Sequence, residues 1–237
     1  MTTYILRHGQ TDYSKQHLVN GDPSHAVLLN EEGVRSCGQP WAVLPLHSVR
    51  TWLASEFPRA RQTASLLMGV PAPEELVVDG RLNELDYGKF EGGPFLEYAS
   101  WLDAHEGSQR PPDARESQRD GIRRMLSGVR AALAYPGPRV LVGHGLLVSV
   151  LLWHRDRSPD EAMPLFFPEA PCIEPLMVPD EVLPDWIGTL LTDLDADEPL
   201  DPEARGSAVI LEIGQATAVA TFDAVVHSPE KKDPPHA

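Results

Sequence analysis

The sequence predicts an α/β fold of three layers, a doubly wound and mostly parallel sheet with helices on both faces. Three observations lead to this prediction. Short apolar, β-prone segments alternate with longer amphipathic segments along the chain. Polar residues directly follow several of the apolar segments. The chain also has 237 residues, of which 42% are hydrophobic, so it can bury the core of one such domain.

The expected strands are short runs of apolar residues. They cover residues 3–6, 49–54, 76–78 and 140–142. Two of the expected helices begin at clear signals, because Asn30 precedes an acidic first turn and Pro58 suits the start of a helix. Pro40 should kink or end the first of these helices. The helices are expected from 31 to about 44, from 58 to 67, at about 94–105 and 115–135, and from 145 to 153.

The segment from Arg155 to Arg205 differs from the rest of the chain in composition. It holds 14 acidic and three basic residues, and nine of the 23 prolines. We expect an elaborated insertion or lid with one short helix near Asp185–Leu191, because prolines interrupt longer helices. Its acidic surface is either simply solvated, or it gates substrate entry or binds a partner.

The chain is expected to form one domain over residues 1–230, closed by a β-hairpin. Residues 208–213 and 217–226 are the two strands of this hairpin, joined through Gly214. The hairpin could pair with a second copy and so form a homodimer. Residues 231–237 are rich in proline and charge, and we expect them to form a flexible tail.

Charge and composition exclude several classes of protein. The net charge of −15 argues against nucleic acid or an anionic membrane as a partner. No apolar run approaches the ~20 residues needed to cross a bilayer, and the N-terminus lacks the features of a signal peptide, so we expect a cytoplasmic location. Cys37 and Cys172 are isolated in the sequence, which favours buried thiols over a disulfide or a zinc site.

Candidate catalytic residues follow two of the expected strands. Arg7 and His8 end the first strand, where a guanidinium beside an imidazole can hold an anion near a nucleophile. Gly9 leaves room for a phosphoryl group, and its amide can face an oxygen. His144 lies between two glycines after an apolar strand, where a histidine has little use in packing.

Two further side chains complete the candidate site. Arg59 follows Pro58 at a helix start and could supply a second guanidinium. Arg61 would face the other way on that helix, so only one of the two arginines should reach the pocket. Glu84 lies in a polar loop after a strand and could donate a proton, with Asp86 as its competitor.

Metal and nucleotide sites find no support in the sequence. The nine histidines form no HxH, HxxxH or HExxH pattern, and the sequence has neither a P-loop nor a GxGxxG motif. We therefore expect neither a metal nor another cofactor.

In their order along the chain, these motifs resemble those of the histidine phosphatase superfamily, the phosphoglycerate mutase-like fold, in its branch with an RHG(E/Q)T opening. The matching segments are Arg7-His8-Gly9-Gln10-Thr11, Leu29-Asn30-Glu31-Glu32-Gly33, Arg59-Ala60-Arg61-Gln62-Thr63-Ala64, Leu82-Asn83-Glu84 with Gly88 and Glu91-Gly92, Arg115-Glu116-Ser117, and Gly143-His144-Gly145. They cover about residues 3–153, and the closing hairpin matches the family's last strands.

The resemblance implies a mechanism that needs no metal. A neutral His8 would attack phosphorus and form a phosphohistidine, with Glu84 as general acid and then as base. The phosphoryl oxygens would be held by Arg7, Arg59 and His144. Further substrate-binding residues are implied at Gly9, Gln10, Ser14, Asn20, Gly21 and Gly145.

The chain departs from the family pattern in two respects. Ser14 stands where an Asn is common, and Leu18 where an Arg is common, which should change the grip on the substrate rather than abolish the chemistry. Between Gly92 and Ser117 there are also no adjacent arginines, the pair that mutases of the family use for the carboxylate of phosphoglycerate.

The leading prediction is a phosphoric monoester hydrolase of the histidine acid phosphatase type, which acts on a small phosphorylated substrate without metal. One alternative is a phosphotransferase of the phosphoglycerate mutase type. Another is a protein that binds a phosphorylated ligand without catalysis. The acidic insertion is expected to overhang the pocket and to disfavour highly charged substrates such as bisphosphates.

Overall fold

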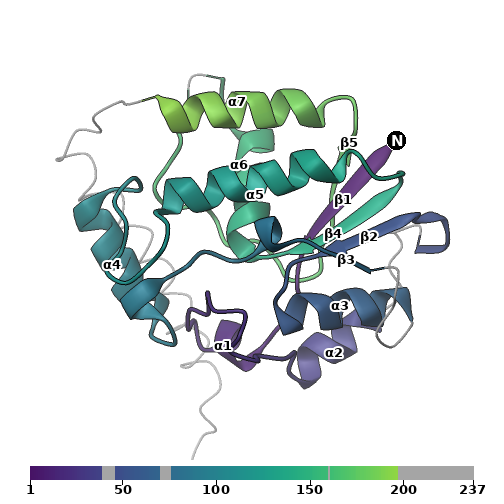
Figure 1. The fold of residues 1–237 in the computed structure, drawn as a ribbon, viewed down its shortest axis with the longest axis horizontal. Helices are drawn as coiled ribbons and strands as arrows, with labels where there is room; N and C mark the ends of the chain where they lie inside the picture. The colour runs from purple at the N-terminus through teal and green to yellow at the C-terminus, as the bar shows by residue number, and fades with distance from the viewer. Residues whose placement is uncertain (39–45, 70–75, 160, 197–237) are drawn as a thin grey trace, which may run out of the picture. The chain divides into compact units, whose positions relative to one another are not determined.

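A five-stranded sheet forms the centre of the structure, a computed structural model that describes residues 1–38, 46–69, 76–159 and 161–196 (Figure 1). The strands are β1 (Thr2–Arg7), β2 (Thr51–Ala54), β3 (Leu76–Val78), β4 (Arg139–Gly143) and β5 (Leu176–Pro179). They lie in the order β3-β2-β4-β1-β5, with β5 antiparallel to β1 and the other neighbours parallel. The predicted α/β fold with a mostly parallel sheet is therefore confirmed.

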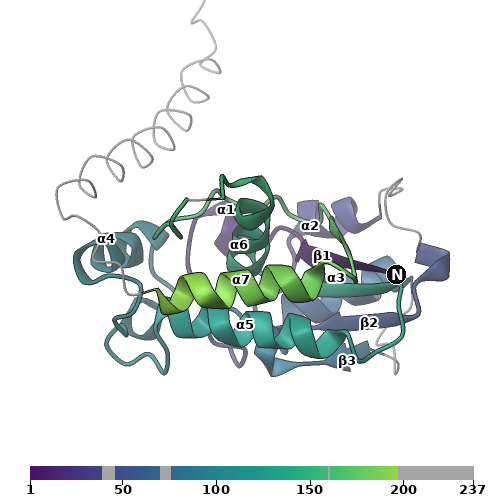
Figure 2. The ribbon, with the colours of Figure 1, turned by 90° about the horizontal axis from the view of Figure 1, so that it is seen from above.

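Helices cover both faces of the sheet (Figure 2). The helices on one face are α2 (Glu31–Cys37) and α3 (Pro58–Met68), and those on the other are α5 (Gln118–Ala132), α6 (Gly145–Asp156) and α7 (Leu183–Asp195). Successive residues of a strand face opposite sides, so Leu6 packs in the cluster with α2 and α3, whereas Ile5 packs in the cluster with α5, α6 and α7. The helices α1 (Asp12–Lys15) and α4 (Phe95–His105) belong to the connections that follow β1 and β3.

The structure confirms the two residues that the sequence indicated as helix starts. The side chain of Asn30 accepts a hydrogen bond from the backbone N–H of Gly33 and caps α2. Pro58 occupies the first turn of α3. The second half of the first predicted helix, which contains Pro40, lies outside the described residues.

The acidic segment 155–205 contains a helix where one was expected, near Asp185–Leu191, but its described part holds more regular structure than the sequence indicated. One stretch of it is strand β5, in which buried and exposed residues alternate. Another is α7, which has 13 residues and buries Leu183, Ile187, Leu190 and Leu194. Pro184 does not interrupt this helix, because it lies in the first turn, where a proline is tolerated. The acidic residues on exposed positions conceal this apolar stripe in the sequence.

Residues Met1–Ala196 form one compact unit. The hairpin expected within 208–226 and the tail at 231–237 lie outside the described residues. In the part of the chain that the structure describes, no helix is both long enough and apolar enough to span a membrane.

Candidate active site

The candidate site lies at the edge of the sheet where the parallel strands end. His8 follows β1, and His144 follows β4. Arg59 lies in α3, shortly after β2, and Glu84 comes after β3. Because β1, β4 and β2 are parallel neighbours, their carboxyl ends meet at this edge. The structure therefore brings the two histidines together, with 5.2 Å between their ring centroids.

His8 is buried and held as a neutral imidazole. Its Nδ1 lies 2.7 Å from the carbonyl oxygen of Gly9, which can only accept, so Nδ1 carries the proton. Its Nε2 accepts a hydrogen bond of 2.9 Å from Nε of Arg59. The pKa of His8 lies well below 6.5, because burial disfavours the imidazolium and Arg59 and Arg7 repel it. His8 thus presents a lone pair on Nε2, which is what a nucleophile needs.

Arg59 connects the two histidines to the loop after α1. Its Nη2 donates to the backbone carbonyl of Asn20 at 2.9 Å and to Nδ1 of His144 at 3.3 Å, and Nη1 donates to the side-chain oxygen of Asn20. Burial lowers the pKa of Arg59 to about 10, so the guanidinium remains charged at neutral pH. Arg61 is exposed, so only Arg59 of this pair reaches the cluster.

His144 is fixed on three sides. Its Nδ1 accepts from Arg59, so Nε2 carries the proton and donates to the hydroxyl of Ser55 at 2.7 Å. The ring of Phe57 packs edge-on at 4.6 Å between centroids. Burial, followed by the charge of Arg59, holds the pKa of His144 well below 6.5. The second histidine is therefore also neutral.

Arg7 is anchored along one edge of its guanidinium. Its Nη1 donates to the carboxylate of Glu169 at 2.8 Å and to the carbonyl of Ala170 at 2.7 Å. Its Nε is buried and has no hydrogen-bond partner among the described residues. A Cβ at Gly145 would lie 3.6 Å from this Nε, so the glycine packs directly against Arg7. Nε is thus a buried donor that lacks a partner, and an anion bound at the site would satisfy it.

Glu84 has the properties of a proton donor. Its carboxylate accepts one hydrogen bond, from the backbone N–H of Leu85 at 2.9 Å. Burial raises the pKa of Glu84 above its ordinary value, although the charges of Arg59 and Arg7 pull it down. For Asp86, burial is outweighed by hydrogen bonds from Arg115, and the pKa is lowered. Of the two carboxyls, Glu84 is the one suited to donate a proton.

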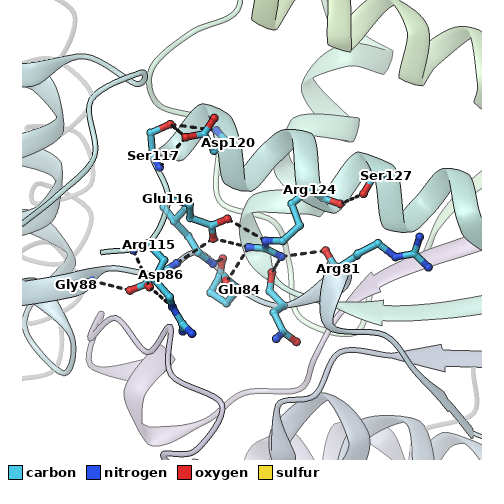
Figure 3. Close-up of polar contacts among 12 residues, drawn as sticks. Arg81, Glu84, Asp86, Gly88, Arg115, Glu116, Ser117, Asp120, Arg124 and Ser127 are labelled. Atoms are coloured by element: carbon cyan, nitrogen blue, oxygen red, sulfur yellow. Dashed lines mark hydrogen bonds and ion pairs between the residues drawn. The ribbon is translucent and has the colours of Figure 1, made fainter. Parts of the chain in front are cut away.

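A cleft of about 290 Å³ opens beside Glu84. It is lined by Gly21, Pro23, Glu56, Gly80, Asn83, Glu84, Asp86, Arg115, Glu116 and Arg124. Figure 3 shows the polar side chains on one side of Glu84, with Arg124 reaching from α5 toward the loop. In the described part of the chain, no three His, Cys, Asp or Glu side chains gather as a metal ion would require.

One known protein family matches most of the chain. The model described as the histidine phosphatase superfamily, branch 1, matches residues 3–174. The chain belongs to this superfamily. Among its relatives, a bifunctional protein of Mycobacterium tuberculosis is 34% identical over 159 residues, which are 62% of this chain and 42% of that protein. A 2,3-bisphosphoglycerate-dependent phosphoglycerate mutase of Rhizobium johnstonii is 31% identical over 160 residues, which are 62% of this chain and 72% of that protein.

Solved structures of the superfamily share the fold. A mycobacterial glucosyl-3-phosphoglycerate phosphatase, solved in complex with VO3, aligns with a TM-score of 0.52 and 26% identity over 64% of this chain and 80% of that one. A protein from Thermus thermophilus aligns with a TM-score of 0.51 and 26% identity over 64% of this chain and 83% of that one. The fold is therefore phosphoglycerate mutase-like. The chain spans only about two fifths of the mycobacterial relatives that it matches in sequence, at 42% of their length.

Three residues that the superfamily resemblance implied as substrate ligands make contacts inside the protein. The N–H of Gly9 donates to the hydroxyl of Thr63 at 3.0 Å instead of facing the site. The side-chain oxygen of Gln10 accepts from Asn30 at 3.1 Å. The hydroxyl of Ser14 completes a capping box with Thr11 at the start of α1. The absent side chain of Gly9 also makes room for α2, since a Cβ would lie 3.1 Å from the carbonyl oxygen of Gly33.

Asn20 and Gly21 support Arg59 rather than presenting free donors. The side-chain amide of Asn20 donates to Glu91 at 2.7 Å, and the N–H of Gly21 donates to the other oxygen of Glu91 at 2.7 Å. A Cβ at Gly21 would lie only 2.0 Å from the carbonyl oxygen of Leu85, so this loop touches the one that carries Glu84. Only glycine permits so close an approach.

Sequence reasoning missed several residues that hold the site in place. They are Ser55, Thr63, Glu91, Glu116 and Arg124. Thr63, Glu91 and Glu116 belong to motifs that matched the family, so their place in a motif was the available signal. Ser55 and Arg124 carried no signal, because each acts on a residue more than 35 positions away in the sequence.

Proposed function

We propose that this protein is a phosphomonoester hydrolase that works through a phosphohistidine at Nε2 of His8. The observation that carries the proposal is the state of His8, a buried neutral imidazole whose proton is fixed on Nδ1 and whose Nε2 lies among cationic groups. Such a lone pair can attack phosphorus, while the guanidinium groups offset the charge of the phosphoryl oxygens.

The first half-reaction transfers the phosphoryl group to His8. Nε2 forms a bond to phosphorus as the ester P–O bond breaks, and the protonated carboxyl of Glu84 gives its proton to the departing oxygen. The raised pKa of Glu84 favours this protonated form. In the second half-reaction, Glu84 takes a proton from water, the water oxygen bonds to phosphorus and the P–N bond breaks. Phosphate leaves, and both residues return to their starting states.

The arginines have different tasks in this scheme. The Nε of Arg7 has no protein partner among the described residues and can bind a phosphoryl oxygen directly. Arg59 donates to the same Nε2 lone pair that attacks phosphorus. It must therefore exchange His8 for a phosphoryl oxygen when substrate binds. Until a phosphate arrives, the hydrogen bond from Arg59 keeps the lone pair of His8 occupied.

The cleft beside Glu84 is the natural place for the leaving group. Its lining includes Gly21, which is next to Asn20, a partner of Arg59, and Glu56, which is next to Ser55, a partner of His144. The acid that protonates the leaving group, Glu84, forms part of its wall.

The charges of the cleft favour a leaving group without further anions. Its wall has four carboxyl side chains, at Glu56, Glu84, Asp86 and Glu116, and two arginines, at Arg115 and Arg124. Arg115 is paired with Asp86 at 2.9 Å, and Arg124 with Glu116 at 2.6 Å, so neither is a free cation. A second phosphate or a carboxylate would be repelled, whereas hydroxyl groups would find acceptors. We therefore expect a neutral, hydroxylated leaving group.

In the described part of the acidic segment, Glu169 binds Arg7 at the site itself.

The test is hydrolysis of p-nitrophenyl phosphate in EDTA by the wild type and His8→Ala, with acid-quenched protein analysed for a phosphate adduct. We expect turnover that survives chelation, an adduct on the wild type, and loss of both in the variant. Activity that persists in His8→Ala would refute the mechanism. Binding without turnover across a panel of phosphate esters would show a phospho-ligand binding protein instead.

A matched pair of substrates tests the leaving-group preference. Glycerol 3-phosphate and 3-phosphoglycerate differ at one position, where the former carries a hydroxymethyl group and the latter a carboxylate. We expect kcat/KM to favour glycerol 3-phosphate by about tenfold, which corresponds to about 1.4 kcal/mol of repulsion. A preference for the carboxylate would contradict the proposed role of the cleft.

A phosphoglycerate mutase activity is the second candidate, because one relative with 31% identity carries that name. The sequence lacks the adjacent arginines expected of such an enzyme between Gly92 and Ser117. Direct measurement of the conversion between 3-phosphoglycerate and 2-phosphoglycerate distinguishes the two candidates. We expect release of inorganic phosphate without isomerisation.

A further inference from the structure

Arg124 holds the loop that carries Glu84, yet the proposed chemistry does not use it. It lies on α5, and its guanidinium donates to backbone carbonyls on the loop. These bonds run from Nη1 to Arg81 at 2.9 Å and to Asn83 at 2.9 Å, and from Nη2 to Glu84 at 3.2 Å. The remaining donors bind the carboxylate of Glu116, from Nε at 2.9 Å and from Nη2 at 2.6 Å.

These contacts use all five N–H groups of Arg124, so the guanidinium has no donor left for a substrate. Arg7 differs, since its Nε is unpartnered among the described residues. Although Arg124 lines the cleft, its side chain is only 25% exposed, and that of Glu116 only 16%. Arg124 is therefore committed to the protein itself.

The Arg124–Glu116 pair fixes the backbone on both sides of Glu84. Arg124 binds the carbonyls of 81, 83 and 84, and Glu116 accepts from the N–H of Asp86 at 3.3 Å (Figure 3). Among the described residues, the carboxylate of Glu84 accepts a hydrogen bond only from its own neighbour, Leu85. No described side chain therefore aims this carboxylate, and its direction depends on where the backbone is held.

Helix α5 is a rigid base for this contact. Its residues Ile122, Met125 and Leu126 are buried in the core. Glycines on the same helix allow the loop to approach closely. A Cβ at Gly121 would lie 2.5 Å from the side chain of Leu85, and one at Gly128 would lie 3.0 Å from that of Arg81.

We propose that Arg124, together with Glu116, is a positioning residue that sets the Glu84 carboxyl for proton transfer to the leaving group. The inference rests on the proposed phosphatase function. It follows from the geometry, because proton transfer requires the acid within hydrogen-bond reach of the departing oxygen, and a shift of about 1 Å costs up to about 100-fold in rate. The planar guanidinium of Arg124 binds three carbonyls and a carboxylate at once, which the single ammonium of a lysine cannot do.

The test compares two phosphate esters of similar size that need the acid to different extents. Benzyl phosphate releases a basic alkoxide, which must be protonated as it leaves, whereas p-nitrophenyl phosphate releases a stable anion. In Arg124→Met we expect kcat/KM for benzyl phosphate to fall about 30-fold and kcat/KM for p-nitrophenyl phosphate less than about threefold, because kcat/KM reports the transfer to His8, in which Glu84 acts as the acid. Arg124→Lys keeps the charge and should recover only part of the loss.

Two further variants guard against a simple loss of folding. Glu116→Gln keeps the size of the side chain and should give a smaller loss with the same dependence on the leaving group. Arg130→Met removes an exposed arginine from the last turn of α5 and should leave both rates at wild-type values. Equal losses for both esters in Arg124→Met and Glu116→Gln would overturn the proposal and leave only a structural role. If the wild type hydrolyses neither ester, the phosphatase function itself fails, and this inference fails with it.

Discussion

The two halves of the candidate site are built in different ways. His8, Arg59 and His144 are buried and joined by side-chain hydrogen bonds at the edge where neighbouring strands end, with Arg59 reaching there from α3. Glu84 is half-buried in a loop, and Arg124 on α5 holds this loop in place through hydrogen bonds to its backbone. The nucleophilic half thus depends on the sheet, whereas the acid half depends on a helix. Damage to one half should leave the other intact.

The largest expected effect concerns the nucleophilic half. Arg59→Met removes the donor that links His8, Asn20 and His144, and one of the two guanidinium groups proposed to hold the phosphoryl oxygens. We expect kcat/KM to fall about 1,000-fold for every ester, with no dependence on the leaving group. Arg61→Met is the matched control on the same helix and should change kcat/KM less than twofold. A loss confined to poor leaving groups would contradict the separation of the halves.

The acid half gives the next largest effect. Glu84→Gln should lower kcat/KM about 100-fold for benzyl phosphate and far less for p-nitrophenyl phosphate, because kcat/KM reports only the transfer to His8. The pH profile of kcat/KM adds a second readout. Activity should rise with pH as His8 loses its proton at its lowered pKa, and fall as Glu84 loses its proton at its raised pKa. The alkaline limb should disappear in Glu84→Gln, and an unchanged limb would assign it to another group.

The buried histidines should also make stability depend on pH. The pKa values of His8 and His144 are lowered by folding, so the unfolded chain binds protons that the folded chain does not. Their contribution is complete above the unfolded value of about 6.5 and declines as the pH falls below it. We expect the free energy of unfolding to drop by up to about 2.7 kcal/mol per pH unit there, one proton for each histidine.

Urea unfolding between pH 7 and pH 5 measures this slope. His8→Asn should remove about half of it. A slope that stays the same in this variant would show that other groups cause the dependence.

The smallest expected effect concerns Ser14. Its hydroxyl accepts a hydrogen bond from the backbone N–H of Thr11 at the start of α1, so Ser14→Ala should cost about 1 kcal/mol, the contribution of one typical hydrogen bond. We expect KM to change less than threefold. Thermal melts and KM values for p-nitrophenyl phosphate check both statements. An increase in KM of tenfold or more would return Ser14 to the group of direct substrate ligands.

The nucleophilic half was the part that the sequence could predict. His8 and His144 directly follow apolar strands, and Arg59 follows the proline that opens a helix, so local patterns place them at one edge of a parallel sheet. The acid half was harder, because Glu84 competes locally with Asp86. Only the structure shows that Asp86 is paired with Arg115.

Other features have no local pattern at all. Arg124 acts on backbone carbonyls some 40 positions earlier in the chain, and a carbonyl carries no residue type that a motif could record. The strand β5 and the full length of α7 were missed because acidic residues dominate the composition of that segment. Burial decides the structure there, and burial depends on packing against β1 and α5.

The contact between Arg7 and Glu169 has a consequence for the rate at which product leaves. A site whose arginines all faced an empty pocket would bind inorganic phosphate tightly after each cycle. Glu169, whose side chain is 67% exposed, keeps one edge of Arg7 engaged and reduces the positive charge that phosphate meets. For the proposed hydrolase, we expect this carboxylate to weaken the binding of phosphate and so to limit inhibition by the product.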